Sequence, residues 1–180
     1  MIHVLYIDDE EHNLTSFRAA FRRTFQVFVT TEPSEAVRIL EENPIEVVIS
    51  DQKMPTLSGV EFFELIMPEH PNPVRMLLTG HADIDAVIDA INKGQIYKYI
   101  SKPWNEAELK RLVEEASELY QFRTAQDMQA SNYSKRLYSA QDKLESLISE
   151  IQSSTEITND TKESYLGTIN EAISLLQVPT

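Results

Sequence analysis

The sequence lacks several residue types, and each absence excludes a class of protein. None of the 180 residues is cysteine, so disulfides, thiolate metal sites and thiol nucleophiles are excluded. No stretch approaches the ~20 apolar residues that a helix needs to cross a bilayer. The first residues also lack the basic region and apolar run of a secretory signal. Membrane insertion is therefore not expected, and the expected compartment is the cytoplasm.

Basic residues are scarce as well, and this bears on possible partners. The formal net charge is −13, of which residues 1–122 carry −10 and residues 123–180 carry −3. Binding to a nucleic acid backbone requires a surplus of lysine and arginine, and neither part has one. Nucleic-acid binding by this chain alone is therefore not expected.

Short apolar runs rich in β-branched residues recur along the first two thirds of the chain. They are Val4–Ile7, Gln26–Val29, Val47–Ile49, Val74–Leu78 and Tyr97–Ile100. Helical periodicity lies between them, as in Leu14, Phe17, Phe21 and again in Ile84, Val87, Ile88, Ile91. Strands that alternate with helices predict an α/β fold with a doubly wound, five-stranded parallel sheet.

An all-α segment is predicted to follow the sheet, because no glycine or proline occurs between Asn105 and Leu166. Steps of three and four residues give one unbroken heptad register: Leu109, Leu112, Ala116, Leu119, Arg123, Gln126, Ala130, Tyr133, Leu137, Ala140, Leu144, Leu147 and Ile151. A lone helix of that length has nothing to cover its apolar stripe, so the pattern favours a homodimer through Leu109–Ile151. The alternative is a shorter helix, a flexible polar linker and a separate hairpin.

A last helix is expected over about Thr161–Gln177. Asp160 and Glu163 have the spacing of a capping box at its start. Its stripe of leucine and isoleucine most simply folds back onto Leu137–Ile151, and two such hairpins would make a four-helix bundle.

Four polar residues each end an apolar strand: Asp8, Asp51, Thr79 and Lys102. Parallel strands place their carboxyl ends on one edge of the sheet, where ligands bind, so these side chains should converge together with Asp9. A single polar residue at a strand end more simply begins a loop. Four of them at four strand ends favour a common site.

The residue types indicate the chemistry of that site. Three crowded carboxylates need a cation, and oxygen ligands alone suit Mg²⁺. Asp51 could then attack a phosphoryl group and become an aspartyl phosphate. The ammonium of Lys102 and the hydroxyl of Thr79 would stabilise the charge on the phosphoryl oxygens.

Residues 1–122 resemble the receiver domain of bacterial two-component response regulators. The matching segments, in the family's order, are Ile7-Asp8-Asp9-Glu10, Ser50-Asp51-Gln52-Lys53-Met54-Pro55, Gly59, Leu78-Thr79-Gly80 and Lys102-Pro103-Trp104. The resemblance implies a flavodoxin-like sheet of order 2-1-3-4-5. It also implies phosphorylation of Asp51 by a sensor histidine kinase, and no enzymatic activity beyond the domain's own phosphorylation and dephosphorylation.

The resemblance further assigns roles to single residues. Asp8, Asp51 and the backbone carbonyl of Lys53 would bind Mg²⁺, and Asp9 would bind it directly or through water. The Lys102–Pro103 peptide bond would be cis. Tyr99 would turn inward when Thr79 turns toward the phosphate, although an ordinary half-buried strand tyrosine is the alternative.

One subgroup is especially similar over the segments that begin at Thr79 and at Lys93. It comprises the receivers that precede HD-GYP phosphodiesterases and those of hydrogenase-type regulators. Residues 123–180 match no output domain, so they are interpreted as a coiled-coil or hairpin tail that dimerises and binds an unknown downstream protein. The alternatives are a fragment of a larger regulator and a phosphorelay intermediate. His81 could tune the lifetime of the phosphate or be an exposed loop residue.

Overall fold

The computed structural model describes residues 1–80, 96–154 and 158–176. The chain divides into two compact units, Met1–Thr124 and Ala125–Thr180. The helix predicted around Ile84–Ile91 and the residue His81 lie outside the described residues.

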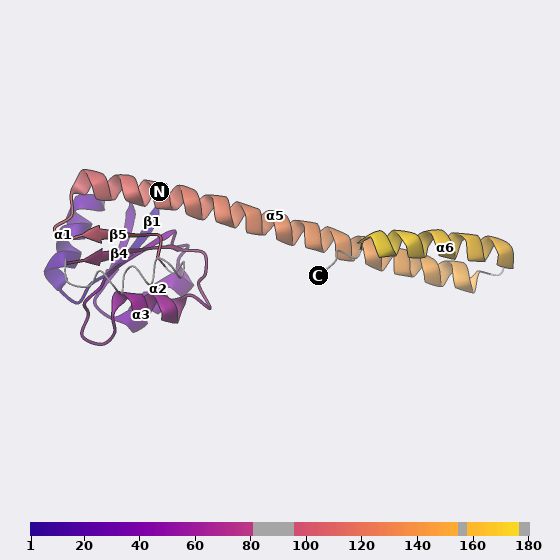
Figure 1. Cartoon of the computed structure of the whole chain (residues 1–180), viewed down its shortest axis with the longest axis horizontal. Helices are drawn as coiled ribbons and strands as arrows, with labels where there is room; N and C mark the ends of the chain where they lie inside the picture. The colour runs from indigo at the N-terminus through magenta and orange to yellow at the C-terminus, as the bar shows by residue number, and fades with distance from the viewer. Residues whose placement is uncertain (81–95, 155–157, 177–180) are drawn as a thin grey trace. The chain divides into compact units, whose positions relative to one another are not determined.

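The first unit is built on a parallel sheet (Figure 1). Its strands are β1 (His3–Ile7), β2 (Gln26–Thr30), β3 (Val47–Asp51), β4 (Val74–Thr79) and β5 (Lys98–Ser101). They run in the order β2-β1-β3-β4-β5, and every adjacent pair is parallel. The predicted fold class and strand order are therefore confirmed. The order reverses between β1 and β3, and a crevice for ligands forms outside the carboxyl ends of such neighbouring strands.

Helices pack on both faces of this sheet. The described helices of the first unit are α1 (Glu11–Phe21), α2 (Pro33–Glu42), α3 (Gly59–Ile66) and the first turns of α5 (Glu106–Ser153). Pro33 is the first residue of α2, a position that suits its fixed φ. Ser58 and Glu61 form a capping box at the start of α3 and so fix where the chain turns back from the loop after β3.

Two clusters of buried side chains hold these layers together. On one face Tyr6 and Ile49 of the sheet pack with α1 and α5, and Trp104 fills the space beside Phe17 and Phe21. On the other face Leu5, Ile7 and Val48 pack with α2 and α3. Burying each large apolar side chain contributes roughly 1.5–3 kcal/mol, so the strands are held from both sides.

The first part of the predicted dimer seam serves the receiver core instead. Leu109, Leu112 and Ala116 of α5 are at most 1% exposed and belong to the cluster that also contains Phe17. Because these side chains already cover the sheet, a seam that begins at Leu109 is wrong. These three residues of the predicted seam are therefore not free to contact another chain.

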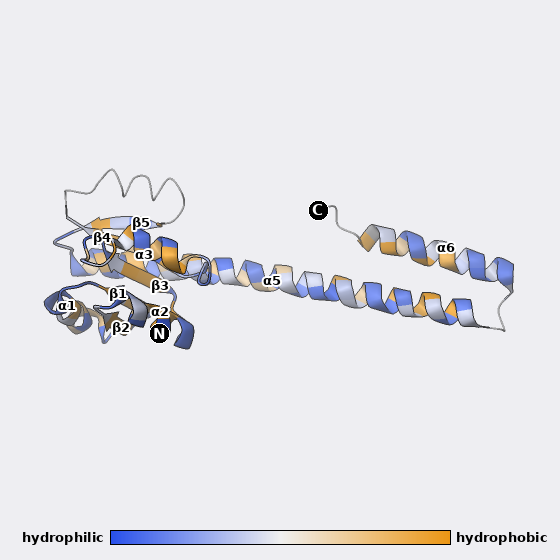
Figure 2. Ribbon diagram, turned by 90° about the horizontal axis from the view of Figure 1, so that it is seen from below, coloured by the Kyte–Doolittle hydropathy of each residue, from blue (hydrophilic) through white to orange (hydrophobic). Residues whose placement is uncertain are grey.

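The predicted continuous helix is confirmed, since α5 runs without interruption from Glu106 to Ser153. In the second unit α6 (Asn159–Leu176) returns alongside the last turns of α5 (Figures 1 and 2). The predicted capping box at Asp160 and Glu163 is wrong. The helix begins earlier, and Thr158, whose hydroxyl contacts that of Thr161 at 2.8 Å, precedes its first residue. None of the helices in the described ranges is both long and apolar enough to span a bilayer.

Candidate functional site

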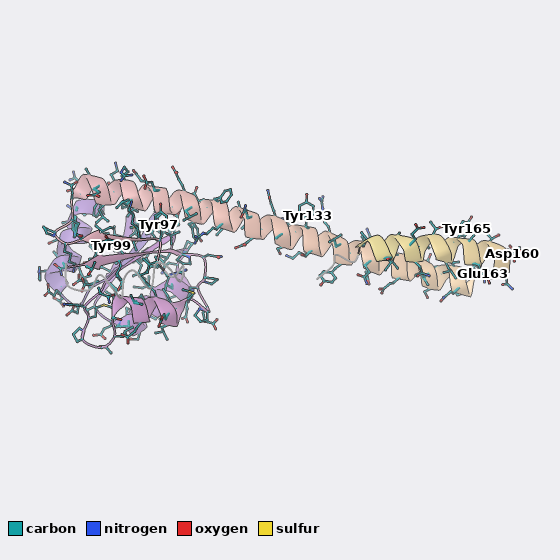
Figure 3. The ribbon with its side chains drawn as sticks, viewed as in Figure 1. Tyr97, Tyr99, Tyr133, Asp160, Glu163 and Tyr165 are labelled. Atoms are coloured by element: carbon teal, nitrogen blue, oxygen red, sulfur yellow. The ribbon has the colours of Figure 1, made fainter. Side chains whose placement is uncertain are left out.

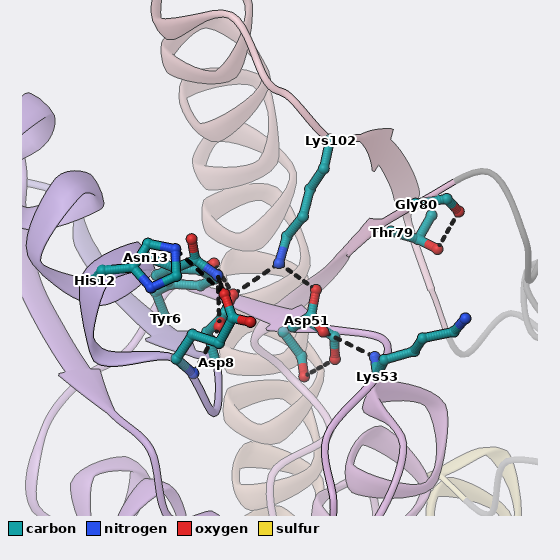
Figure 4. A network of polar contacts seen from close by, with 11 residues as sticks. Tyr6, Asp8, His12, Asn13, Asp51, Lys53, Thr79, Gly80 and Lys102 are labelled. Carbon is teal, nitrogen blue, oxygen red and sulfur yellow. Dashed lines mark hydrogen bonds and ion pairs between the residues drawn. The ribbon is translucent and has the colours of Figure 1, made fainter.

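A hollow of about 350 Å³ opens at the carboxyl edge of the sheet (Figure 4). Asp8 follows β1, Asp51 ends β3 and Lys102 follows β5, so three strands deliver these side chains to one place. The hollow is also lined by Asp9, Glu10, Asn13, Gln52, Lys53 and Gly80. The convergence expected at this edge is therefore observed for Asp8, Asp9, Asp51 and Lys102, and Lys53 lines the same hollow.

Lys102 bridges the two buried carboxylates. Its Nζ lies 2.8 Å from Oδ2 of Asp8 and forms a second ion pair with Oδ1 of Asp51. The two carboxylate side chains are almost fully buried, whereas that of Lys102 is 28% exposed. One ammonium thus compensates two charges that the fold has removed from water, and the protein needs that compensation because unpaired buried charges are costly.

Asp8 is held by two side chains that the sequence analysis did not identify. The hydroxyl of Tyr6 donates to Oδ2 of Asp8, and Nδ2 of Asn13 donates to Oδ1 at 2.9 Å. The backbone N–H of Glu10 donates to the same Oδ1 at 3.0 Å. Tyr6 lies two residues before Asp8, and period-two alternation places it on the same side of the strand. That spacing was the available signal, and Asn13 in the first turn of α1 offered none.

These contacts set the charge states of the site. Burial opposes ionisation of Asp8, but donors from Lys102, Tyr6 and Asn13 outweigh it and hold the pKa of Asp8 below its ordinary value. Burial raises the pKa of Asp51, and repulsion from Asp8 adds to burial, against the lowering effect of Lys102. Burial would lower the pKa of Lys102, but hydrogen bonds to both carboxylates raise it overall.

The loop after β3 fixes Asp51 from the other side. The backbone N–H of Lys53 donates to Oδ2 of Asp51 at 2.8 Å, and that of Gln52 donates to the carbonyl of Leu78 at 2.9 Å. Gly59 lies so close that a Cβ there would meet the backbone oxygen of Asp51 and would stand 2.6 Å from Cδ1 of Leu77. Glycine is therefore required at this position, because the neighbouring backbone leaves no room for a side chain.

Thr79 and Tyr99 are not directed into the hollow. The hydroxyl of Thr79 donates to the carbonyl of Gly80 at 2.9 Å instead of approaching Asp51 (Figure 4). Tyr99 is 42% exposed. The Lys102–Pro103 peptide bond is cis, as the resemblance implied.

The donor chemistry of the hollow fits Mg²⁺. Among the described residues no group of three or more histidine, aspartate and glutamate side chains is placed to hold a metal ion. Of the three carboxylates predicted to crowd together, Asp8 and Asp51 share the ammonium of Lys102, whereas Asp9 lines the same hollow but is exposed. Two carboxylates and the backbone carbonyl of Lys53 would nonetheless supply only oxygen ligands, which suit a hard, partly hydrated cation.

Comparison with known proteins gives a family. A family model described as the response regulator receiver domain matches residues 4–114. The hydrogenase transcriptional regulatory protein HoxA of Bradyrhizobium diazoefficiens is 34% identical over 117 residues, which are 65% of this chain and 24% of that protein. The chain thus spans about a quarter of the length of this curated relative.

Two solved structures extend the likeness. The signal receiver domain of an HD domain-containing protein from Pseudomonas fluorescens Pf-5 has a TM-score of 0.64 at 27% identity, covering 69% of this chain and 92% of that one. The beryllofluoride-activated NtrC4 receiver domain dimer has a TM-score of 0.61 at 30% identity, covering 67% and 99%. The subgroup resemblance noted in the sequence is therefore confirmed. The chain belongs to the response regulator receiver domain family, and it contains the receiver domain of a two-component response regulator.

Proposed function

We propose that Asp51 accepts a phosphoryl group from a sensor histidine kinase. The observation that carries this proposal is the ammonium of Lys102, which is held between Asp8 and Asp51 at the carboxyl edge of the sheet. The Asp51 carboxylate is reachable from the hollow, and its cation partner is already in place. That arrangement suits transfer of a strongly charged group.

In the proposed step a carboxylate oxygen of Asp51 attacks the phosphorus of a phosphohistidine. The new O–P bond forms as the P–N bond breaks, and the histidine nitrogen keeps the electron pair and takes up a proton. Lys102 neutralises charge on the transferred oxygens, since its Nζ already contacts Asp51. Thr79 would exchange its Gly80 acceptor for a phosphoryl oxygen, and Tyr99 would then turn inward.

Asp8, Asp51 and the carbonyl of Lys53 would hold Mg²⁺, with Asp9 binding directly or through water. When bound, the ion supplies positive charge to the phosphoryl oxygens. Asp8 is suited to this task, because Tyr6, Asn13 and Glu10 already orient both of its oxygens. The domain would catalyse only its own phosphorylation and dephosphorylation.

The second unit would carry the output. We propose that the tail formed by α6 and the end of α5 self-associates and binds a downstream protein. Helix α5 could carry the signal from the receiver to this tail, because it begins four residues after Lys102 and continues to Ser153. A second candidate is that the receiver is the input module of a longer regulator. The observation in its favour is that the chain aligns with only 24% of the hydrogenase regulator.

Labelling by a small phosphodonor tests the acceptor. Wild-type protein incubated with acetyl phosphate and Mg²⁺ should gain one phosphoryl group by intact-mass spectrometry, and a chelator should prevent the gain. Asp51→Asn should not be labelled, whereas Asp142→Asn in the tail should be labelled like wild type. Equal labelling of Asp51→Asn would show that the acceptor assignment is wrong.

A further inference from the structure

The tail hairpin leaves its apolar side chains only half covered. In the described part of Ala125–Thr180 no residue is fully buried. The stripe between the two helices contains Leu137, Leu144, Ile148 and Ile151 of α5 and Leu166, Ile169, Ile173 and Leu176 of α6, all of intermediate exposure. Two helices alone cover one stripe of each other and cannot enclose a core.

A second apolar stripe lies beside the first on each helix. At 100° per residue, Tyr133, Ala140 and Leu147 share one flank of α5, while Tyr165 and Ala172 share one flank of α6. Leu147 is 46% exposed and Tyr165 is 52% exposed, and each stands six residues from the turn end of its helix. Figure 3 labels Tyr133 and Tyr165, whose side chains extend from α5 and α6.

The handedness of an antiparallel pair places these two flanks on the same side of the hairpin. We call this side the apolar tail face and define it by Ala140, Leu147, Tyr165 and Ala172. The opposite side is polar and carries Ser134, Gln141, Glu145, Glu163 and Asn170. There Gln141 donates to Glu145 at 3.1 Å, so this side satisfies its own polar groups in part.

The size of the apolar tail face suits a second hairpin. The 18 residues of α6 give a length of about 27 Å, and two helices give a width of about 20 Å. These dimensions give a flat projected area of roughly 500 Å². The accessible surface of the face is larger because side chains project from it, so it approaches the ~800 Å² that each partner buries in a standard interface. The alanines at the middle of the face allow helices to approach closely.

The rims of the face are charged, and small side chains at its middle favour one arrangement of the two hairpins. Arg136 and Lys143 flank the face on α5, and neither makes an ion pair within the described ranges. Glu150 follows Lys143 by seven residues on the same rim of α5, so this rim carries both signs of charge. Ala140 and Ala172 each stand 13 residues from the turn end of their helix, so packing α5 of one copy on α6 of the other brings two small side chains to the same level.

We propose that a second copy of this chain packs on the apolar tail face, with α5 of each copy against α6 of the other, to form a four-helix bundle. This proposal rests on the self-association in the proposed function and specifies its surface. The interface uses both helices, and the segment of α5 between Phe122 and Met128 takes no part in it. The heptad positions of this segment hold the polar residues Arg123 and Gln126.

The absence of cysteine allows a direct test in the full chain, because any introduced thiol is the only one. Equal amounts of Ala140→Cys and Ala172→Cys, carrying tags of different mass, are mixed under oxidising conditions. The proposal predicts mainly the mixed disulfide between the two variants. The matched control, Gln141→Cys mixed with Asn170→Cys on the polar side, should give little mixed product.

Light scattering distinguishes a wrong interface from an absence of self-association. Wild type should be a dimer, Leu147→Arg should weaken the dimer at least about tenfold, and Gln141→Arg should not. If the dimer crosslinks equally through the control pair, or tolerates Leu147→Arg, the apolar tail face is not the interface, although self-association itself would still hold. A strict monomer at every concentration overturns both, and neither result bears on labelling of Asp51.

Discussion

Lys102 occupies the central position among the charged residues of the site. Its ammonium contacts Asp8 at 2.8 Å and also pairs with Asp51, and its own side chain remains partly accessible. An ammonium that contacts both carboxylates can stabilise the unphosphorylated site. It can then neutralise the charge of a phosphoryl group on Asp51. Stability and reactivity at this site should therefore be linked through one residue.

Replacing Lys102 by methionine should destabilise the receiver in the absence of Mg²⁺. Two buried carboxylates would lose their shared cation, which we expect to lower the free energy of unfolding by about 1–3 kcal/mol, less than for a fully buried pair because Lys102 is partly exposed. Added Mg²⁺ should stabilise the variant more than it stabilises wild type, as denaturant unfolding would show. The control Lys110→Met removes only an exposed pair with Glu114 and should change stability by less than about 0.5 kcal/mol.

Asp51→Asn should stabilise the receiver at neutral pH in Mg²⁺-free buffer. The pKa of Asp51 is raised in the folded state by burial, so above that pKa the charge of the carboxylate lowers the free energy of unfolding. As the pH falls through the folded pKa, wild type binds a proton and the gap in stability between the two proteins should close. Thermal unfolding across this pH range measures the gap.

Asp8→Asn should change the free energy of unfolding in the opposite direction. The pKa of Asp8 is lowered, so its charge supports folding above the ordinary aspartate pKa, and that support is lost as the pH falls through the folded value. The variant should be less stable than wild type at neutral pH. If both variants changed stability in the same direction, the assigned charge states would be wrong.

Whether a residue of the site could be predicted from the sequence depends on its position in the chain. Asp8, Asp51 and Lys102 could be found because parallel strands bring their carboxyl ends together. The orientation of Thr79 could not, since its hydroxyl reaches the neighbouring Gly80 carbonyl as easily as it would reach a ligand. Asn13 was missed because only the packing of α1 brings it to Asp8.

At the scale of elements, Gly59 ties the start of α3 to the loop that carries Asp51. Gly59→Ala would place a methyl group against the Asp51 backbone oxygen and the Leu77 side chain. We expect a loss of about 1–3 kcal/mol in unfolding free energy, because the backbone cannot yield as a flexible side chain can. The control Gly167→Ala, where nothing lies within 4 Å, should stabilise α6 by about 0.5–1 kcal/mol. Chemical denaturation of both variants measures the difference, and equal effects would contradict the close approach at Gly59.

The sequence predicted elements well and their partners less well. The alternation of strand and helix patterns predicted the sheet correctly, because apolar residues recur with different periods in strands and in amphipathic helices. The heptad pattern gave a continuous α5 but assigned Leu109, Leu112 and Ala116 to a dimer. Packing on a sheet and packing on another helix require the same spacing of apolar residues, so periodicity cannot tell them apart. The capping box at Asp160 was wrong because α6 begins at Asn159, which places Asp160 inside the helix.

At the scale of the whole molecule, α5 connects the site to the tail. Its first turns are buried on the sheet, and Ser117 donates to Glu46 at 2.6 Å, while Glu46 also accepts from the backbone of His3 at 3.2 Å. This anchors α5 at the amino edge of the sheet, opposite the hollow. The proposed signal from the receiver to the tail would therefore run along a helix whose first turns are fixed on the sheet.

Beryllium fluoride with Mg²⁺ mimics the phosphoryl group and should change the dimer dissociation constant of wild type. Coupling energies of this kind typically correspond to about 5–150-fold changes in affinity. Sedimentation at a series of concentrations would measure the change, and Asp51→Asn should show none. A wild-type dissociation constant that ignores the mimic would contradict coupling between Asp51 and the tail.

The most direct measurement of the central claim is to locate the phosphoryl group on the chain. After reaction with acetyl phosphate and Mg²⁺, borohydride reduces an aspartyl phosphate to homoserine, and tandem mass spectrometry of the peptides identifies the reduced position. We predict homoserine at position 51 and nowhere else. Homoserine at position 8 or 9, or phosphate on a residue other than Asp51, would contradict the assignment of Asp51 as the acceptor.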